Sequence, residues 1–302
     1  MTRAIAAALA LAAASALVAA VILVARSRAE PPARCAAGLV ALGARCCGRG
    51  QRLDGDRCAG PPTACAAGME VTAEGCVARA RQVTLAGGLL RVGPGDWEAQ
   101  GVVAPYVAEV APFAIDALEV TEHRYARCVA ARSPDACAAL PLSGEPGRAV
   151  AGVTFDEAAR FCAWAGGSLP TSDQLAFAAA GRSGRRYAWG DTGAVCRRAT
   201  WGIAAGPCGF GGRGPELAGS HPDGASPDGV LDLAGNVAEW ARPVGEAPIV
   251  RLTHADVRGG SFADGSAGAL RSWQRRSVPS DTRSPEVGFR CGYPAGAAAR
   301  DR

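Results

Sequence analysis

Cysteine is the residue type with the most chemistry to offer in this chain of 302 residues, which contains twelve cysteines but only three histidines. Thiolates can hold a metal, attack a substrate or pair as disulfides. A zinc site needs closely spaced ligand pairs, and apart from the adjacent Cys46 and Cys47 no two cysteines are nearer than seven positions. An even number of cysteines without such pairs predicts disulfide bonds rather than structural zinc.

Six of these cysteines mark a unit that occurs three times, with ten residues between the cysteines of each unit: Cys35 and Cys46, Cys47 and Cys58, Cys65 and Cys76. The first two units carry Gly43 and Gly55 eight positions after their first Cys, where a turn would reverse the chain. We predict three hairpin-like loops, each closed by its own disulfide, which stabilises a loop of this size by about 3 kcal/mol. We interpret residues 30–82 as a Cys-rich triple repeat that serves as a spacer; a ligand-binding stalk is the alternative.

A second group of residues with chemical potential lies in the loop Asp232–Trp240. It contains Asn236, the only Asn of the chain, directly after Gly235. Asn adopts a left-handed backbone more readily than most residues, which predicts a tight turn here. The acids Asp232 and Glu239 would repel each other if the turn brought them together without a cation. A bound cation would remove this repulsion. The alternative is a capped turn without a cation, in which Glu239 lies in solvent.

The elements that must position these residues are predicted for residues 83–293. Segments 83–93 and 113–120 have the pattern of strands, the first as a strand or a hairpin. Thr121 is a candidate helix cap, and Thr154 and Thr171 each open a capping box, with Glu157 and Gln174 three positions later. Residues 183–230 are rich in Gly, Pro, Asp and Ser. We therefore expect an α+β domain with little regular secondary structure, followed by a disordered tail at 294–302.

The start of the chain predicts export. Residues 4–24 are apolar except for Ser15, flanked by Arg3 and Arg26. The length lies between that of a signal peptide and that of a membrane span, so residues 1–29 are a cleaved signal peptide or an uncleaved membrane anchor through residues 4–24. Both place the rest of the chain outside the cytoplasm, secreted, periplasmic or anchored, and disulfides persist in such compartments.

The charge balance argues against a nucleic-acid partner. All 32 basic residues are Arg, against 28 acids, for a net charge of +4. Without residues 1–29, which carry three Arg and no acid, the net charge is +4 − 3 = +1. That charge gives no electrostatic footprint for DNA or RNA.

Several motifs, in order, resemble the formylglycine-generating enzyme family, also called the sulfatase-modifying factor family. They are Glu119-Val-Thr, Gly152-Val-Thr-Phe-Asp-Glu-Ala, Phe161-Cys-Ala-Trp-Ala-Gly-Gly-Ser-Leu-Pro-Thr171, Trp189-Gly, Asp232-Leu-Ala-Gly-Asn-Val-Ala-Glu-Trp240, Arg258-Gly-Gly-Ser-Phe262 and Gly288-Phe-Arg-Cys291. The resemblance covers residues 83–293 and leaves the repeat outside. It implies the family's variant of the C-type-lectin fold.

The resemblance also implies site residues. The family's oxidases convert a sulfatase Cys into formylglycine with copper and oxygen at two cysteines, six and eleven positions after the Arg of Arg-Gly-Gly-Ser. In this chain those positions hold Asp264 and Ala269. Copper(I) prefers thiolates, so we expect no copper site and no catalytic residue. A structural calcium ion is expected, with side-chain ligands Asp232 and Glu239 and backbone carbonyl ligands Gly235 and Val237.

The remaining cysteines complete a disulfide scheme. Cys128 and Cys137 are expected to close a local loop, as are Cys196 and Cys208. Cys162 and Cys291 are then left, and they match a long-range bridge of the family. We thus expect an exported, non-catalytic binding or structural module that recognises a protein or glycan. The alternative is an oxidoreductase of the family, which forms formylglycine or performs unrecognised metal-dependent chemistry.

Overall fold

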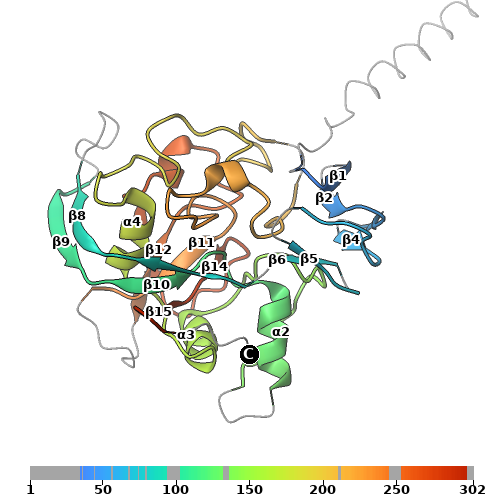
Figure 1. The fold of residues 1–302 in the computed structure, drawn as a ribbon, viewed down its shortest axis with the longest axis horizontal. Helices are drawn as coiled ribbons and strands as arrows, with labels where there is room; N and C mark the ends of the chain where they lie inside the picture. The colour runs from blue at the N-terminus through green and yellow to red at the C-terminus, as the bar shows by residue number, and fades with distance from the viewer. Residues whose placement is uncertain are drawn as a thin grey trace, which may run out of the picture.

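The structure is a computed structural model that describes residues 35, 37–43, 45–55, 57–66, 69–73, 75–78, 80–93, 103–131, 136–209, 212–244 and 253–297. The predicted leader at 1–29 and most of the predicted tail lie outside these residues. Within the described parts of the chain, no helix is both long and apolar enough to cross a membrane. The described chain forms a mixed α+β body, with the small N-terminal strands packed at one side of it (Figure 1).

The repeat folds as three antiparallel hairpins. Their strands are β1 (Leu39–Leu42) with β2 (Arg45–Gly48), β3 (Arg52–Asp54) with β4 (Arg57–Ala59), and β5 (Met69–Val71) with β6 (Cys76–Ala78). Each hairpin is closed by the bridge expected from its unit. Gly43 and Gly55 both have a positive φ at the turns, as their positions predict.

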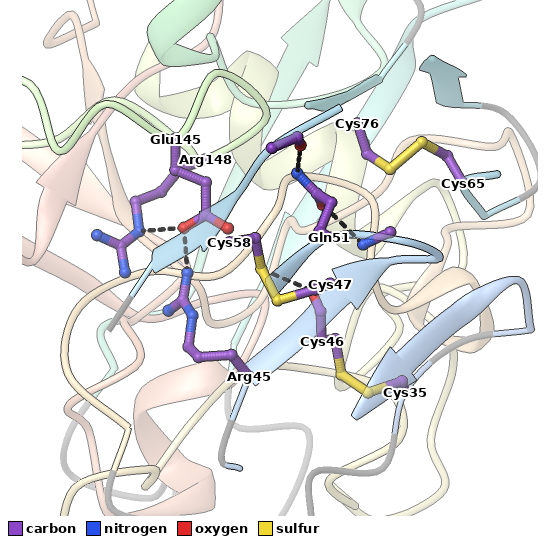
Figure 2. The surroundings of a disulfide bond; sticks show 12 residues. Cys35, Arg45, Cys46, Cys47, Gln51, Cys58, Cys65, Cys76, Glu145 and Arg148 are labelled. Atoms are coloured by element: carbon purple, nitrogen blue, oxygen red, sulfur yellow. Dashed lines mark hydrogen bonds and ion pairs between the residues drawn. A yellow bond between two sulfur atoms is a disulfide. The ribbon is translucent and has the colours of Figure 1, made fainter. Parts of the chain in front are cut away.

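The repeat lies against the main domain and shares buried contacts with it. Arg45 of β2 forms an ion pair with Glu145, whose Oε2 also lies 3.5 Å from Arg148 Nε (Figure 2). Arg45 and Arg148 both donate to the carbonyl of Pro215, at 3.4 and 2.8 Å. A spacer alone would need no such contact, so the repeat is also a docked part of the fold. Whether it holds the domain away from a membrane stays a prediction.

The described residues of the main domain form three sheets, which enclose the core together with the helices. The first has the order β15-β10-β7, the second the order β13-β12-β11-β14, and the third pairs β8 with β9. Their bounds are β7 Gln82–Leu85, β8 Gly88–Val92, β9 Tyr106–Val110, β10 Phe113–Asp116, β11 Ala238–Ala241, β12 His254–Arg258, β13 Arg275–Pro279, β14 Val287–Gly288 and β15 Gly292–Pro294. All neighbours are antiparallel except β11 and β14.

Two strand predictions need correction. Residues 83–93 contain β7 and β8, but these do not pair as a hairpin, because β7 pairs with β10 and β8 pairs with β9. The strand predicted over 113–120 ends at Asp116, where the chain turns toward Glu119 and the helix that follows. Both differences depend on partners far away in the sequence, which a local pattern does not reveal.

The helices begin where the caps predict. They are α2 (Glu122–Ala130), α3 (Phe155–Trp164) and α4 (Ser172–Ala180), with N-caps Thr121, Thr154 and Thr171. Both predicted capping boxes form with reciprocal side-chain and backbone hydrogen bonds. The irregular stretch 183–230 contains, among its described residues, only the short 3-10 helix η2 (Pro222–Gly224); a second one, η3 (Ala267–Leu270), follows β12.

The core of the domain forms around aromatic side chains of α3, β11 and the C-terminal segment. Phe161 and Phe289 are fully buried and meet edge-on, with 5.3 Å between the ring centroids. Trp240 is fully buried and donates its indole N–H to the carbonyl of Val153 at 2.9 Å. The bridge Cys162–Cys291 ties α3 to the segment before β15, and Cys128–Cys137 and Cys196–Cys208 also form as expected.

Candidate functional site

The loop before β11 carries the site, and its backbone has an unusual shape. Among the described residues other than Gly, only Asp232 and Asn236 have positive φ angles, 52° and 58°. Gly235 between them has a φ of 83°, and a Cβ there would lie 2.4 Å from the carbonyl oxygen of Thr200. The left-handed turn predicted from Gly235 and Asn236 is therefore present, and a larger residue at Gly235 would collide with backbone.

Asn236 uses every polar group that it has. Its side-chain amide donates to Glu119 Oε2 at 2.5 Å, and its side-chain oxygen accepts from the backbone N–H of Glu216 at 2.8 Å. Its backbone N–H donates to Thr200 O, and its carbonyl accepts from Phe262 N–H, both at 2.8 Å. Asp would lack the donor and Gln would be too long, which gives a physical reason for the only Asn of the chain.

Glu119 and Arg290 complete a buried network around this loop. Glu119 also accepts from the backbone N–H of Val237 at 3.0 Å. Glu239 forms a bidentate pair with Arg290, whose Nη2 and Nε lie 2.6 and 2.7 Å from its two oxygens. Arg290 is fully buried and donates in addition to the carbonyls of Asp116 and Leu231. Such a two-point pair fixes both planar groups.

The network holds more negative than positive charge. Burial and the neighbouring charges of Asp232 and Glu239 raise the pKa of Glu119 well above its usual range, against the opposing effect of Arg290. Burial also raises the pKa of Asp232 and Glu239, opposed by the Gly219 N–H and by Arg290 respectively. Three buried carboxyls against one guanidinium favour either a shared proton or a further cation.

The two predicted acidic calcium ligands, Asp232 and Glu239, both lie in this network, but their oxygens already have hydrogen-bond partners in the protein. Asp232 Oδ2 accepts from Gly219 N–H at 2.5 Å, and both oxygens of Glu239 are taken by Arg290. In the described ranges, no three His, Cys, Asp or Glu side chains form a metal-ligating group. The hard oxygens and the excess negative charge suit calcium, while the ion pair of Glu239 competes with it. Calcium bound by Asp232, Gly235, Val237 and Glu239 stays a prediction.

The two positions that the family resemblance links to copper lie on a partly exposed turn after β12. Asp264 Oδ2 accepts from the N–H and the hydroxyl of Ser261 at 2.7 and 3.0 Å, so this carboxylate stabilises its own turn. The same hydroxyl lies 3.3 Å from Glu286 Oε2. Ala269 belongs to η3 and offers only a methyl group. All twelve cysteines of the chain are in the six disulfides, and none in the described chain is free.

Sequence reasoning missed the roles of Glu119 and Arg290. Both stood inside the motifs that carried the family resemblance, but Glu119 lies 117 positions from Asn236 and Arg290 lies 51 from Glu239. It also missed the buried pair of His221 and Glu216, 3.0 Å apart. No local spacing signals the contacts of Glu119 and Arg290, because they join segments far apart in the sequence. The only available signal was the presence of single charged residues inside apolar motifs.

Known proteins resemble this chain over its main domain. Residues 70–293 match the family model "Sulfatase-modifying factor enzyme 1-like domain", a match that begins inside the third repeat unit. The chain is 34% identical over 163 residues to the inactive C-alpha-formylglycine-generating enzyme 2 of Mus musculus, covering 49% of this chain and 50% of that protein. It is 31% identical over 174 residues to the formylglycine-generating enzyme of Streptomyces coelicolor, covering 50% and 54%. The chain thus spans about half the length of these curated relatives.

Solved structures support the fold. The chain is similar to Treponema denticola variable protein 1, with a TM-score of 0.55, 18% identity and coverage of 71% of this chain and 95% of that one. It is also similar to PvdO from Pseudomonas aeruginosa, with a TM-score of 0.57, 19% identity and coverage of 70% and 94%. The fold is the formylglycine-generating-enzyme variant of the C-type-lectin fold, preceded by a disulfide-rich region. The chain belongs to the sulfatase-modifying factor enzyme 1-like domain family.

Proposed function

We propose that this chain is a non-catalytic binding module built on the formylglycine-generating-enzyme scaffold. The observation that carries this proposal is the chemistry at positions 264 and 269. A carboxylate that is already bound to Ser261 and a methyl group replace the two thiols that the family's oxidases use. Neither group is a soft ligand for copper(I), and the cysteines elsewhere are consumed in bridges. The buried hydrogen bonds of Asn236 and of the Trp240 indole are nonetheless present.

The relatives fit this proposal without deciding it. Proteins named as inactive C-alpha-formylglycine-generating enzyme 2, from mouse and from Bos taurus, are each 34% identical to the chain over the matched part. Proteins named as formylglycine-generating enzymes are 31% and 30% identical. These similar identities keep an oxidoreductase as the second candidate. Residues at the reacting positions, rather than overall identity, must separate the two functions.

The proposed place of action is outside the cytoplasm, with residues 4–24 as signal or anchor. Six disulfides within the chain are consistent with an oxidising compartment. The proposed partner is a protein or a glycan rather than a nucleic acid, because the exported part carries almost no net charge. Fractionation of cells that express the full chain, followed by peptide mapping under non-reducing conditions, tests the location and the bridges together.

The test of the proposed function is an assay for formylglycine formation. The purified, oxidised chain is incubated with a Cys-containing sulfatase peptide, copper and oxygen, and an active formylglycine-generating enzyme serves as the positive control. We expect no product, and no copper(I) retained against a competing chelator. The Asp264→Cys/Ala269→Cys variant is the matched control, because it supplies two thiols at these positions and should retain more copper(I). Turnover by the unmodified chain would establish the oxidoreductase instead.

A further inference from the structure

The peptide group that joins Pro215 to Glu216 lies between the repeat and the loop that contains Asn236. Its oxygen, the carbonyl oxygen of Pro215, accepts from Arg45 Nη1 at 3.4 Å and from Arg148 Nε at 2.8 Å. Its nitrogen, the backbone N–H of Glu216, donates to the side-chain oxygen of Asn236 at 2.8 Å. A peptide group is planar, so the position of its oxygen restricts the direction of its N–H. One rigid unit of backbone therefore connects an arginine of the repeat to the only Asn of the chain.

The two arginines that hold this oxygen also share one carboxylate. Arg45 and Glu145 form an ion pair, and Arg148 Nε lies 3.5 Å from the same oxygen of Glu145 (Figure 2). The side chains of Arg45, Glu145 and Arg148 are buried, with exposed fractions of 6%, 2% and 9%. A buried carboxylate that loses one of its cations is destabilised, so loss of Arg45 disturbs Glu145 and, through it, Arg148.

The electrostatics of Glu216 give a second link with the repeat. Burial raises the pKa of the Glu216 carboxyl, but the hydrogen bond and charge of His221 and the hydrogen bond from Thr200 lower it below its usual range. The positive charge of Arg45 acts in the same direction. Arg45 thus stabilises the charged form of the residue whose backbone N–H holds Asn236.

Apolar and backbone contacts dock the repeat on the same segment. Leu217 belongs to a buried cluster that includes Leu39 and Cys76 of the repeat. A Cβ at Gly147 would lie 2.1 Å from the carbonyl oxygen of Cys76, so the two backbones are in direct contact there. The repeat therefore reaches the 215–217 segment through packing as well as through charge.

We propose that the repeat acts as a conformational clamp on the loop that contains Asn236, with the peptide between Pro215 and Glu216 as the connection. When the repeat is docked, Arg45 and Arg148 hold the peptide oxygen, and the N–H is aligned with Asn236. When the repeat undocks, the peptide is free to rotate and the N–H loses that alignment. Coupling between two sites is reciprocal, so a partner that undocks the repeat would loosen the loop, and a ligand that locks the loop would strengthen docking. This inference goes beyond the proposed binding function and does not depend on it.

Hydrogen exchange tests the clamp, because it reports the opening of each segment separately. The purified, oxidised chain and its variants are compared at one pH by mass spectrometry of peptides that cover residues 45–48, 213–218 and 234–238, with α3 as the internal reference. We expect Arg45→Met to raise exchange about tenfold in residues 213–218 and 234–238, the effect of losing one hydrogen bond to a charged group, and to leave α3 unchanged. Arg52→Met is the matched control, because Arg52 is an exposed arginine on β3 of the same repeat. It should leave the exchange of residues 213–218 and 234–238 unchanged.

The clamp is wrong if Arg45→Met raises exchange only within the repeat, or if it raises exchange in α3 as much as in residues 234–238. It is also wrong if Arg52→Met has the same effect on residues 234–238. Reciprocity requires that Asn236→Ala in turn raise exchange in residues 45–48 more than in α3.

A second variant at the same position keeps the test independent of how well Arg45→Met folds. Arg45→Lys keeps the charge beside Glu145 but replaces the planar guanidinium with a single ammonium, so it should raise exchange in residues 234–238 less than Arg45→Met does. If Arg45→Met does not fold, Arg45→Lys carries the test, and unchanged exchange in residues 234–238 would then overturn the proposal. Formylglycine turnover in the assay described above would refute the proposed function but leave these exchange rates as measured.

Discussion

Asn236→Asp is the change that most directly tests the network beneath the loop. The substitution keeps the size of the side chain and the oxygen that accepts from Glu216 N–H. It removes the amide donor that lies 2.5 Å from Glu119 Oε2 and places a second carboxylate there. Asp also tolerates the left-handed backbone at φ 58°, so the backbone conformation is matched.

The magnitude follows from the contacts that are lost and the charge that is gained. A hydrogen bond to a charged group contributes about 1.5–3 kcal/mol. Repulsion between two buried carboxyls adds to that loss until one of them takes up a proton. We therefore expect Asn236→Asp to lower the free energy of unfolding by about 3–5 kcal/mol at pH 7, a large part of a typical domain's stability.

The dependence on pH identifies the cause. A carboxyl whose pKa is raised in the folded state favours folding less and less as pH rises from its unfolded pKa toward the raised value. The pKa of Glu119 is already raised by burial and by neighbouring charges. In Asn236→Asp, a proton shared by the two carboxyls at acid pH restores a hydrogen bond. The stability difference from the wild type should therefore shrink as pH falls from 7 toward 5.

The assay is urea unfolding of the oxidised chain, followed by tryptophan fluorescence, at several pH values. Asn236→Ala is the control, because it loses both side-chain bonds but adds no charge, so its stability difference should vary much less with pH. The reasoning is refuted if Asn236→Asp differs from the wild type by less than about 1 kcal/mol at pH 7. A stability difference that stays constant with pH would refute the electrostatic part.

Three other predictions concern bridges, a histidine and calcium. Replacing both cysteines of the Cys162–Cys291 bridge by Ala should cost about 4.9 kcal/mol of loop entropy, against about 2.6 for the Cys128–Cys137 bridge, because the separations are 129 and 9 residues; equal losses in urea unfolding would contradict this. Burial lowers the pKa of His221, but the hydrogen bond and charge of Glu216 outweigh it and raise the pKa above 6.5. The free energy of unfolding of wild type should therefore exceed that of His221→Gln below about pH 6.5, and the difference should vanish as pH rises further. A difference that grows with pH would contradict this. If calcium binds the 232–240 loop, a chelator should lower the melting temperature and excess calcium should restore it, because calcium at a hundredfold excess over its dissociation constant adds about 2.7 kcal/mol to the free energy of unfolding. A melting temperature that the chelator leaves unchanged would contradict calcium binding by this loop.

The structure also changes how the calcium prediction should be tested. Glu239→Ala removes a predicted ligand, but it also leaves Arg290 buried without its partner, since Arg290 binds both oxygens of Glu239. Removing one member of a buried pair destabilises a protein by about 3–5 kcal/mol without any metal. Asp232→Asn is the better variant, because Asp232 receives a backbone N–H and forms no direct ion pair with Arg290. A chelator that lowers the melting temperature of wild type but not of Asp232→Asn would favour the calcium site.

The sequence predicted the local features of the fold well. Capping boxes need only residues three positions apart, so the starts of α3 and α4 could be placed from Thr154 and Thr171. The three bridges of the repeat could be predicted because the two cysteines of each unit have the same separation, 11 positions, so each pair closes a loop of the same size. Asn236 and Gly235 predicted the left-handed turn, because few residues adopt that backbone without strain.

Contacts between segments far apart in the chain could not be predicted from the sequence. The pairing of β7 with β10 and of β8 with β9 depends on how the sheets pack, and no spacing within residues 83–93 encodes it. The docking of the repeat depends on the pair of Arg45 and Glu145, 100 positions apart. Burial of an unpaired charge is unfavourable, so a charged residue is expected to lie in solvent unless its partner is known. Buried ion pairs are thus the features that sequence reasoning assigns least well.

The buried network around Asn236 also holds the Arg258–Phe262 segment in place. The carbonyl of Asn236 accepts the N–H of Phe262, and Gly235 N–H donates to Gly259 O, so the loop holds the Arg258–Phe262 segment by its backbone. The turn that follows is closed by Asp264 itself through Ser261. None of these bonds requires a cysteine at position 264 or 269. The geometry of this segment therefore rests on the buried network and on the turn closed by Asp264, and no thiol at position 264 or 269 takes part in it.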